Sequence, residues 1–282
     1  MRKGDEVRDD MVTKEINNFN LRQICDSGQC FRMEQVSENC YRVIAYGRSL
    51  EILQEGERCT FFCTRQEFEE IWSGYFDLET DYQNYIESIS PKDSYLLAAA
   101  AWGSGIRILR QDLWEMIASF LISQQNHITR IRKCIRNLCE AYGEERKSDS
   151  GEVFYTFPGP EKLVGLDEDA LKACNLGYRS KYVVRTAKSI VEGEVDLEKI
   201  RQMSYGKAKK ELLKLFGVGE KVADCICLFA LHHLQAFPVD THISQALQKH
   251  YKRGFPNRRY KGMQGVMQQY IFYYELTGEK EV

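Results

Sequence analysis

The chain changes its residue pattern once, near residue 95, and this change limits the folds open to it. Before that point, short β-rich runs alternate with turn residues, and two helical pieces follow at Arg65–Ile71 and Asp81–Ile89. From Ser94 onward the pattern is almost wholly helical. The sequence therefore predicts an α+β fold, in which an N-terminal antiparallel β-sheet domain (1–95) packs on a larger all-helical domain (96–282). The expected strands are Gln29–Met33, Tyr41–Tyr46, Ser49–Leu53 and Cys59–Cys63.

Two of the expected helices are apolar nearly all round, and we expect them to be buried in the centre of the helical domain. They span Leu113–Ile122 and Val222–Leu231. Pro238 breaks the chain before a further helix that starts near Asp240. The other expected helices are Ile128–Tyr142, Asp167–Ala173, Lys181–Glu192, Lys207–Phe216 and Lys261–Leu276.

Charge, apolar runs and cysteine spacing exclude several classes of protein. The net charge of −2 lends no support to nucleic-acid binding by bulk basicity. No stretch has the ~18–20 consecutive apolar residues of a membrane helix, and the N-terminal residues lack a secretory signal. We therefore expect a protein that is not secreted and whose ten cysteines are free thiols in a reducing compartment. None of them forms a C-x-x-C pair, so no side-chain metal site is expected.

A tight turn, Gly217-Val218-Gly219, separates two helical runs. Two glycines let the backbone approach another surface closely, and the new helix N-terminus offers unsatisfied N–H groups to a phosphate. This is the pattern of a helix-hairpin-helix, although an ordinary glycine-rich turn between helices would look the same.

Two chemically distinctive residues flank the second of these helices. Lys221 lies in its first turn, where the helix dipole disfavours the charged form of an amine and so favours a nucleophile. Asp240 follows the helix, in Pro238-Val239-Asp240, where it is also expected to cap the next helix. The basic clusters could face phosphate or simply be solvated helix surfaces; they are Arg130/Arg132/Lys133/Arg136, Lys207/Lys209/Lys210/Lys214 and Lys252/Arg253/Arg258/Arg259/Lys261.

This segment resembles the helix-hairpin-helix (HhH-GPD) DNA glycosylase superfamily, and GVGEKVADCICLFAL looks like the 8-oxoguanine DNA glycosylase/lyases of the eukaryotic type. The resemblance covers nearly the whole chain in the family's order. Outside the hairpin it rests on Leu21–Gln23, Ser27–Arg32, Tyr75–Leu78, Gly105–Asp112, Asn175–Arg179, Gln268 and Phe272.

The resemblance implies an enzyme of base-excision repair that flips 8-oxoguanine out of duplex DNA. Lys221 would attack C1′ and form a Schiff base, from which β-elimination cuts the strand, while Asp240 would stabilise positive charge on the sugar. The carbonyl of Gly28 would accept a hydrogen bond from N7, which is a donor only in the lesion. Cys225 and Phe272 would sandwich the base and Gln268 would bind its Watson–Crick edge.

The same resemblance assigns residues that contact the rest of the DNA. Tyr178 matches a wedge tyrosine, and Gln125 stands where the family usually has a wedge asparagine, with Asn126 beside it. This departure leaves open how strictly cytosine is required opposite the lesion. Arg130 and Arg179 match arginines that read the orphan cytosine. Phosphate contacts are assigned to Gly217, Val218, Gly219 and His242.

The expected partner is duplex DNA containing 8-oxoguanine opposite cytosine, bound by a monomer away from any membrane. Such a protein would work at the nucleoid in the cytoplasm of a prokaryote, or in the nucleus of a eukaryote. No soluble cofactor is needed, although the family's hairpin often holds a cation through backbone carbonyls. An iron–sulfur cluster is excluded because no cysteine follows Cys227.

Two alternatives remain at this point. A glycosylase of the same superfamily could act on another lesion, such as an alkylated purine or a mispaired adenine, but Lys221 and the missing cluster argue against these. A non-catalytic DNA-binding protein could use the hairpin only to grip phosphate. Preference for a lesion-containing duplex would distinguish the enzyme from such a binding protein.

Overall fold

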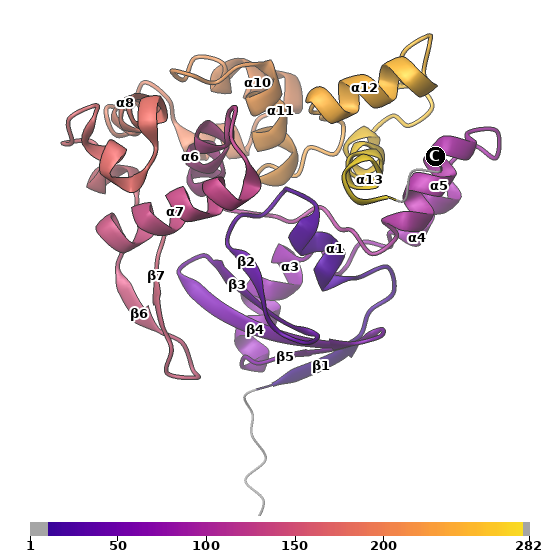
Figure 1. Cartoon of the computed structure of the whole chain (residues 1–282), viewed down its shortest axis with the longest axis horizontal. Helices are drawn as coiled ribbons and strands as arrows, with labels where there is room; N and C mark the ends of the chain where they lie inside the picture. Colours follow the sequence, from indigo (N-terminus) through magenta and orange to yellow (C-terminus); the bar gives the residue numbers. More distant parts are fainter. Residues whose placement is uncertain (1–10, 279–282) are drawn as a thin grey trace, which may run out of the picture.

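The computed structural model describes residues 11–278, and its N-terminal part forms a five-stranded antiparallel sheet in the order β1-β5-β4-β3-β2 (Figure 1). The central hairpin joins β3 (Cys40–Ala45) to β4 (Arg48–Glu55), with Val43 opposite Leu50. Alternate residues of β3 are buried, as expected for a sheet with one face on a core. The other strands are β1 (Val12–Glu15), β2 (Met33–Ser37) and β5 (Arg58–Phe61).

Short helices complete this sheet domain. Helix α1 (Leu21–Asp26) lies above the sheet in Figure 1, and its buried residues join the same core as the strands. A second helical run follows β5 and contributes Trp72 to this core. It consists of α2 (Arg65–Glu67), a π-helical turn (Phe68–Trp72) and α3 (Ser73–Tyr75).

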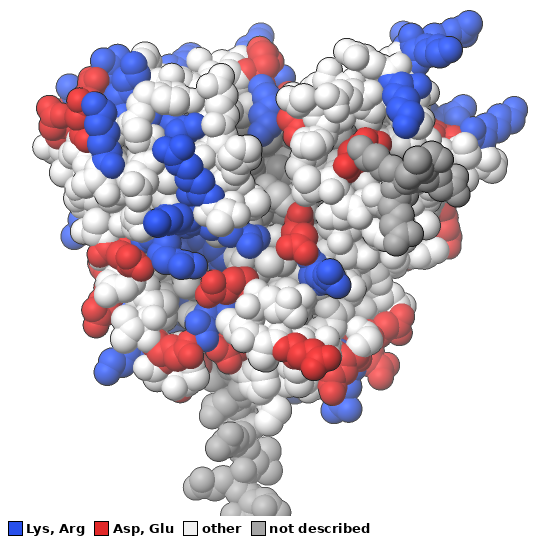
Figure 2. All heavy atoms as spheres, in the orientation of Figure 1, with Lys and Arg blue, Asp and Glu red and all other residues white. Residues whose placement is uncertain are grey.

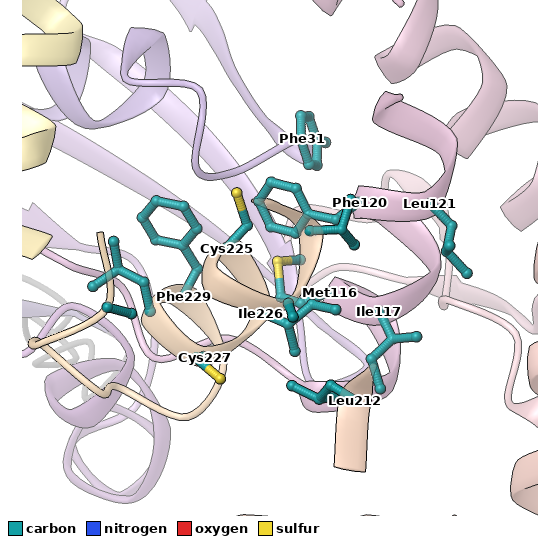
Figure 3. Packing of buried hydrophobic residues seen from close by; sticks show 14 of the residues in the cluster. Phe31, Met116, Ile117, Phe120, Leu121, Leu212, Cys225, Ile226, Cys227 and Phe229 are labelled. Atoms are coloured by element: carbon teal, nitrogen blue, oxygen red, sulfur yellow. The ribbon is translucent and has the colours of Figure 1, made fainter. Parts of the chain in front are cut away.

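The larger domain is built around two helices that are buried on nearly every side. In α6 (Leu113–Ser123) and α11 (Glu220–Phe229) almost all residues are buried, which confirms the prediction from their apolar sequences. Their side chains interlock around Ile117, Phe120 and Ile226 (Figure 3). The surrounding helices are α4 (Gln83–Glu87), α5 (Ser94–Trp102), α7 (Ile128–Tyr142), α8 (Ser180–Val191), α9 (Leu197–Arg201), α10 (Tyr205–Leu212), α12 (Thr241–His250) and α13 (Gln264–Thr277).

Three local predictions differ from the structure. The first expected strand, Gln29–Met33, is wrong except for its last residue, because the Gln29 side chain instead bonds the segment 107–109. The expected helix Asp167–Ala173 is a 3₁₀ turn at Ala170–Cys174. The helical region also contains a β-hairpin, β6 (Glu145–Lys147) and β7 (Val153–Tyr155), whose turn includes Gly151 with a positive φ of 85°.

The segment between the sheet and α6 packs with the helices. Tyr82, Ile89 and Leu96 belong to the larger core, and α5 lies against α13 near the other end of the chain. The predicted domain boundary near residue 95 stays a prediction. All ten cysteines are free thiols, as predicted for a protein of a reducing compartment, and nine of them are buried. In the described part of the chain, no helix is long and apolar enough to cross a membrane.

Candidate functional site

The predicted helix-hairpin-helix is confirmed between α10 and α11. Gly217 has a φ of +88°, and a Cβ there would come within 2.8 Å of the Tyr182 ring, so only glycine fits. The extended Gly219 precedes α11 and supplies no side-chain cap. The first N–H groups of α11 therefore have no side-chain partner, which leaves them available to an anion. The carbonyl of Gly217 accepts a hydrogen bond of 3.0 Å from Gln124 Nε2, which ties the hairpin to the end of α6.

Lys221 and Cys225 lie one turn apart on the same face of α11. The Lys221 Nζ is 5.6 Å from the centroid of the Phe120 ring, and the lysine is only partly buried. Burial raises the pKa of Cys225 to about 11, and the nearby charge and hydrogen bond of Lys221 oppose this rise. Figure 3 shows the Cys225 thiol on the side of α11 that faces Phe31, while Cys227 points the other way. Lys221 thus reaches the edge of the core from a rigid helix.

Asp240 occupies the N-cap of α12, as predicted. Its Oδ1 accepts a hydrogen bond of 2.8 Å from the Ile243 backbone N–H. Its negative charge also acts on Cys225 and raises the pKa of that thiol, whereas the charge of Lys221 lowers it. The lysine and the carboxylate, nineteen positions apart in the sequence, therefore both lie within electrostatic reach of one buried thiol.

The residues assigned to the base pocket also come together. Gly28 has a φ of +73°, and a Cβ at this position would lie 3.0 Å from Cε1 of Phe272. The His242 ring stands edge-on to Phe272 at a centroid distance of 6.1 Å. Gln268 lies one turn before Phe272 on α13 and is buried, with Nε2 donating to the Pro238 carbonyl at 3.1 Å and Oε1 accepting from Gln269. The structure thus brings together the Gly28 loop, the start of α12 and the middle of α13.

Gln29 and Gln111 position Gly28, although the sequence analysis gave neither residue a role. The buried Gln29 side chain donates to the Arg107 carbonyl and accepts from the Leu109 N–H, both at 2.9 Å. Gln111 donates to the Gln29 carbonyl at 2.8 Å, and its own N–H bonds the Phe229 carbonyl at the end of α11. This chain of hydrogen bonds connects Gly28 to the lysine-bearing helix. Gln111 stands between Arg110 and Asp112, and Gln29 follows Asp26, Ser27 and Gly28, so the sequence offered no local signal that either glutamine is buried.

The wedge residues lie beside the hairpin. Gln125 has a φ of +48° and projects from the turn after α6, where its Oε1 accepts a hydrogen bond of 3.3 Å from Tyr178. Both side chains are exposed. Asn126 turns back instead, with Nδ2 donating to the Ile122 carbonyl at 3.2 Å and Oδ1 accepting from the His127 N–H.

The two arginines assigned to the orphan base differ in environment. Arg130 is exposed on α7. Arg179 is buried, and its guanidinium donates to the carbonyls of Gln124 at 2.8 Å and Gln125 at 2.9 Å. In this structure Arg179 therefore fixes the turn that carries Gln125.

Lys209 does not present a free charge to solvent, unlike its neighbours in sequence. Its Nζ lies 2.7 Å from a Glu220 oxygen and 2.9 Å from an oxygen of the buried Asp224, which also accepts from the Tyr205 hydroxyl. Although burial opposes it, these carboxylates raise the pKa of Lys209. Its role is to join α10 to α11 and so to fix the hairpin. Within residues 11–278, no group of three or more His, Cys, Asp or Glu side chains could hold a metal ion.

The chain is similar to known proteins in both sequence and structure. Residues 11–117 match the family model of the 8-oxoguanine DNA glycosylase N-terminal domain, and residues 118–261 match that of the HhH-GPD superfamily of base excision DNA repair proteins. An 8-oxoguanine glycosylase/lyase of Clostridium acetobutylicum, solved with double-stranded DNA containing cytosine opposite 8-oxoguanine, is 36% identical. The two structures superpose with a TM-score of 0.88, and the match covers 94% of this chain and 94% of the Clostridium chain.

Two curated relatives are similar over shorter lengths. A probable N-glycosylase/DNA lyase of Methanothermobacter thermautotrophicus is 31% identical over 70% of this chain and 71% of its own length. The N-glycosylase/DNA lyase of Saccharomyces cerevisiae is 32% identical over 63% of this chain, and the match spans half of the yeast protein.

Proposed function

Because the chain belongs to the HhH-GPD superfamily of base-excision DNA repair proteins, we propose that it excises 8-oxoguanine from duplex DNA and cuts the strand at the resulting site. The observation that carries the proposal is that Lys221 and Asp240 both act on the ionisation of the buried Cys225, while Phe272 lies against Gly28. A protein that only grips phosphate has no need of an amine and a carboxylate placed together beyond its hairpin.

The reaction starts from Lys221 in its neutral form. The Nζ lone pair attacks C1′ of the flipped nucleotide, the bond from C1′ to the base breaks, and the base leaves with that electron pair. The carboxylate of Asp240, fixed at the start of α12, stabilises positive charge as it develops on the sugar. The amine of the adduct then loses a proton, the C1′–O4′ bond breaks and O4′ takes up a proton, so that the sugar ring opens and a C1′=N Schiff base forms. Removal of a C2′ proton then expels the 3′-phosphate, which cuts the strand by β-elimination.

Recognition of the lesion depends on the Gly28 backbone. In 8-oxoguanine N7 carries a hydrogen, so a carbonyl aimed at N7 accepts a hydrogen bond from it. In guanine N7 is itself an acceptor, so the same carbonyl would be repelled. Phe272 and Cys225 are proposed to stack on the two faces of the base, and Gln268 to bind its Watson–Crick edge. A flipped base has to enter between side chains that are close together in this structure, because Phe272 already contacts the Gly28 position.

The remaining DNA contacts are proposed for the exposed turn and for the hairpin. Gln125 and Tyr178 fill the space left by the flipped base, while Arg130 and Arg179 read the orphan cytosine, with Asn126 shaping the turn. Gly217, Val218, Gly219 and His242 face the backbone phosphates of the lesion strand. The chain is proposed to act as a monomer, in the cytoplasm of a prokaryote or the nucleus of a eukaryote.

No step of this reaction uses a soluble cofactor. A cation held by backbone carbonyls of the hairpin stays a proposal. The carbonyls of Leu215 and Gly217 already accept hydrogen bonds from Val218 and Gln124, so they offer such a cation only their second lone pairs.

Borohydride trapping tests the proposal, because borohydride reduces a Schiff base to a stable amine. Duplexes with one 8-oxoguanine opposite each of the four bases are incubated with the protein, with Lys221→Gln and with Lys214→Gln. We expect a covalent adduct with the first and third proteins and none with Lys221→Gln. Lys214, on the other side of the hairpin and paired with Glu211, is the matched control. Absence of an adduct together with strands that stay intact after alkali would refute the lysine mechanism for this lesion.

A further inference from the structure

A cavity of about 710 Å³ lies away from the candidate active site, between α7, the sheet and the β6–β7 hairpin. None of the residues assigned to catalysis or to the lesion pocket lines it. It begins at Ile128 and Thr129, in the first turn of the helix that also carries Arg130. Its volume is within the range of small-molecule sites in proteins. The cavity therefore needs an explanation separate from that of the lysine site.

The walls of the cavity combine an apolar floor with a charged rim. The floor is made by buried side chains, which include Phe31, Met33, Ile135 and Phe154. Five cationic residues and three carboxylates line the rim, a difference of two positive charges (5 − 3). Basic side chains gather in the region of α7 at the centre left of Figure 2. The rim residues are Arg32, Arg42, Arg132, Lys133 and Arg136, with Glu34, Glu140 and Glu152.

Three of the five cationic residues already have carboxylate partners. Arg32 lies 3.5 Å from Glu115, Arg136 lies 3.5 Å from Glu34, and Arg42 pairs with Glu51 and with Glu152. In the described part of the chain, Arg132 and Lys133 have no carboxylate within ion-pair distance.

Arg132 is the more informative of the two unpaired cations. Its Nη2 donates to the Cys25 carbonyl at 2.9 Å, while its Nε is buried and has no hydrogen-bond partner among the described residues. An unpartnered buried N–H costs free energy, and the charged guanidinium of Arg132 lines the cavity without a carboxylate to neutralise it. Lys133 lies in the same wall and is exposed at the rim. An anion between these two side chains would meet two unused positive charges.

We propose that this cavity binds a nucleotide, with its phosphate between Arg132 and Lys133 and its base on the apolar floor. A bare phosphate would leave the floor in contact with water, and an uncharged ring would leave the charges of Arg132 and Lys133 without a counter-charge. A phosphate ester that carries a flat ring satisfies both walls at once. Its source is either a free nucleotide or an unpaired nucleotide of the bound DNA strand, because α7 begins beside the wedge turn.

Calorimetric titration with thymidine 5′-monophosphate tests the proposal. Thymine is chosen because neither the lesion pocket nor the orphan-base contacts are expected to take it. We expect binding at low salt, and at least tenfold weaker binding of both thymidine and inorganic phosphate. Lys133→Glu should weaken the affinity for thymidine monophosphate at least tenfold. The matched charge reversal Lys92→Glu, on the loop between α4 and α5, should leave it unchanged.

Equal affinities of the two charge-reversed proteins, or no binding to the parent protein, would overturn the proposal. Arg132→Gln should also weaken binding, and its melting temperature is measured because Arg132 also holds the Cys25 carbonyl. Competition between thymidine monophosphate and a duplex would identify the DNA strand as the natural occupant, and absence of competition would identify a free nucleotide. Nucleotide binding in the cavity is independent of the excision activity. Trapping at Lys221 can fail while nucleotide binding persists, and nucleotide binding can fail while trapping persists.

Discussion

Gly28 has two separate reasons to be glycine. Its φ of +73° strains any residue with a Cβ, and that Cβ would also stand 3.0 Å from the Phe272 ring. Gly56 provides a contrast at the same scale, because it has a φ of +65° but nothing within 4 Å of an added Cβ. Comparison of the two positions therefore separates backbone strain from obstruction of the proposed base pocket.

The substitution Gly28→Ala is expected to impair excision beyond its effect on stability. Both Gly28→Ala and Gly56→Ala should lose about 1–2 kcal/mol of unfolding free energy, since both force a Cβ into the left-handed region. Only Gly28→Ala should lower kcat/KM on 8-oxoguanine, by roughly tenfold or more, because Phe272 must move away from the base. Urea unfolding and single-turnover excision are the measurements. Equal loss of activity in both variants would contradict the proposed role of Gly28 in the base pocket.

Asp240 combines a structural cap with a proposed electrostatic role, and Asp240→Asn separates the two. Asparagine caps a helix about as well as aspartate, so the melting temperature should change little. Loss of the charge should lower the rate of excision about 100- to 1,000-fold. Asp196→Asn is the control, because Asp196 caps α9 through the Lys199 N–H at 3.1 Å. An Asp240→Asn protein that melts early and regains activity at lower temperature would support the cap alone.

At the scale of elements, the angle of the hairpin depends on the contact between α10 and α11. Lys209 bridges Glu220 and the buried Asp224, and this contact holds the helix that carries Lys221. Because the carboxylates raise the pKa of Lys209, its contribution to stability is complete below the ordinary lysine pKa of about 10.4. The contribution disappears only as the pH rises through the higher pKa of the folded state.

Lys209→Met should therefore destabilise the protein at pH 7, by about 1–3 kcal/mol. The loss is smaller than for a fully buried pair because Lys209 keeps some contact with water. Lys210→Met, at an exposed position next to it, should change the unfolding free energy by less than about 0.5 kcal/mol. If Asp224→Asn restores part of the stability of Lys209→Met, the unpaired carboxylate is the cause. Additive effects of the two substitutions in the double mutant would contradict a direct interaction between Lys209 and Asp224.

At the scale of the whole molecule, Asp77 joins the sheet domain to the helices. It follows α3, and its carboxylate accepts from Arg110 at 2.9 Å and from the Tyr82 hydroxyl at 3.0 Å, while His232 Nε2 lies 3.3 Å away. Burial opposes ionisation, but the nearby His232 and the hydrogen-bonded Arg110 hold the pKa of Asp77 well below its usual range. The ionised group therefore stabilises the native arrangement of the two parts.

The sign of this linkage fixes its pH dependence. A depressed carboxyl pKa contributes stability that is fully present above the unfolded value of about 3.9 and is lost as the pH falls towards the native value. The free energy of unfolding of the parent protein should exceed that of Asp77→Asn by about 2 kcal/mol at pH 7 and at pH 5. The difference should shrink at pH 3, as urea unfolding at the three pH values can measure. A difference that is constant across these pH values would show that the charge of Asp77 is not the cause.

Sequence patterning alone determined the elements and the chemistry that they carry. Local propensity and apolar periodicity fixed α6 and α11, and Gly217-Val218-Gly219 fixed the hairpin, because their causes lie within a few residues. The Asp240 cap followed in the same way. Lys221 and Asp240 could be singled out because an amine and a carboxylate at helix starts have a chemical meaning of their own.

Tertiary structure decided which of these residues meet, because the contacts join segments far apart in the chain. Gly28 lies against Phe272 in a loop that the hydrogen bonds of Gln29 and Gln111 join to the end of α11. The turn of Arg179 towards Gln125 and the cavity under α7 are likewise results of packing. Hydrogen bonds of buried polar groups are satisfied by whatever surface the fold presents, so residue order alone does not specify them.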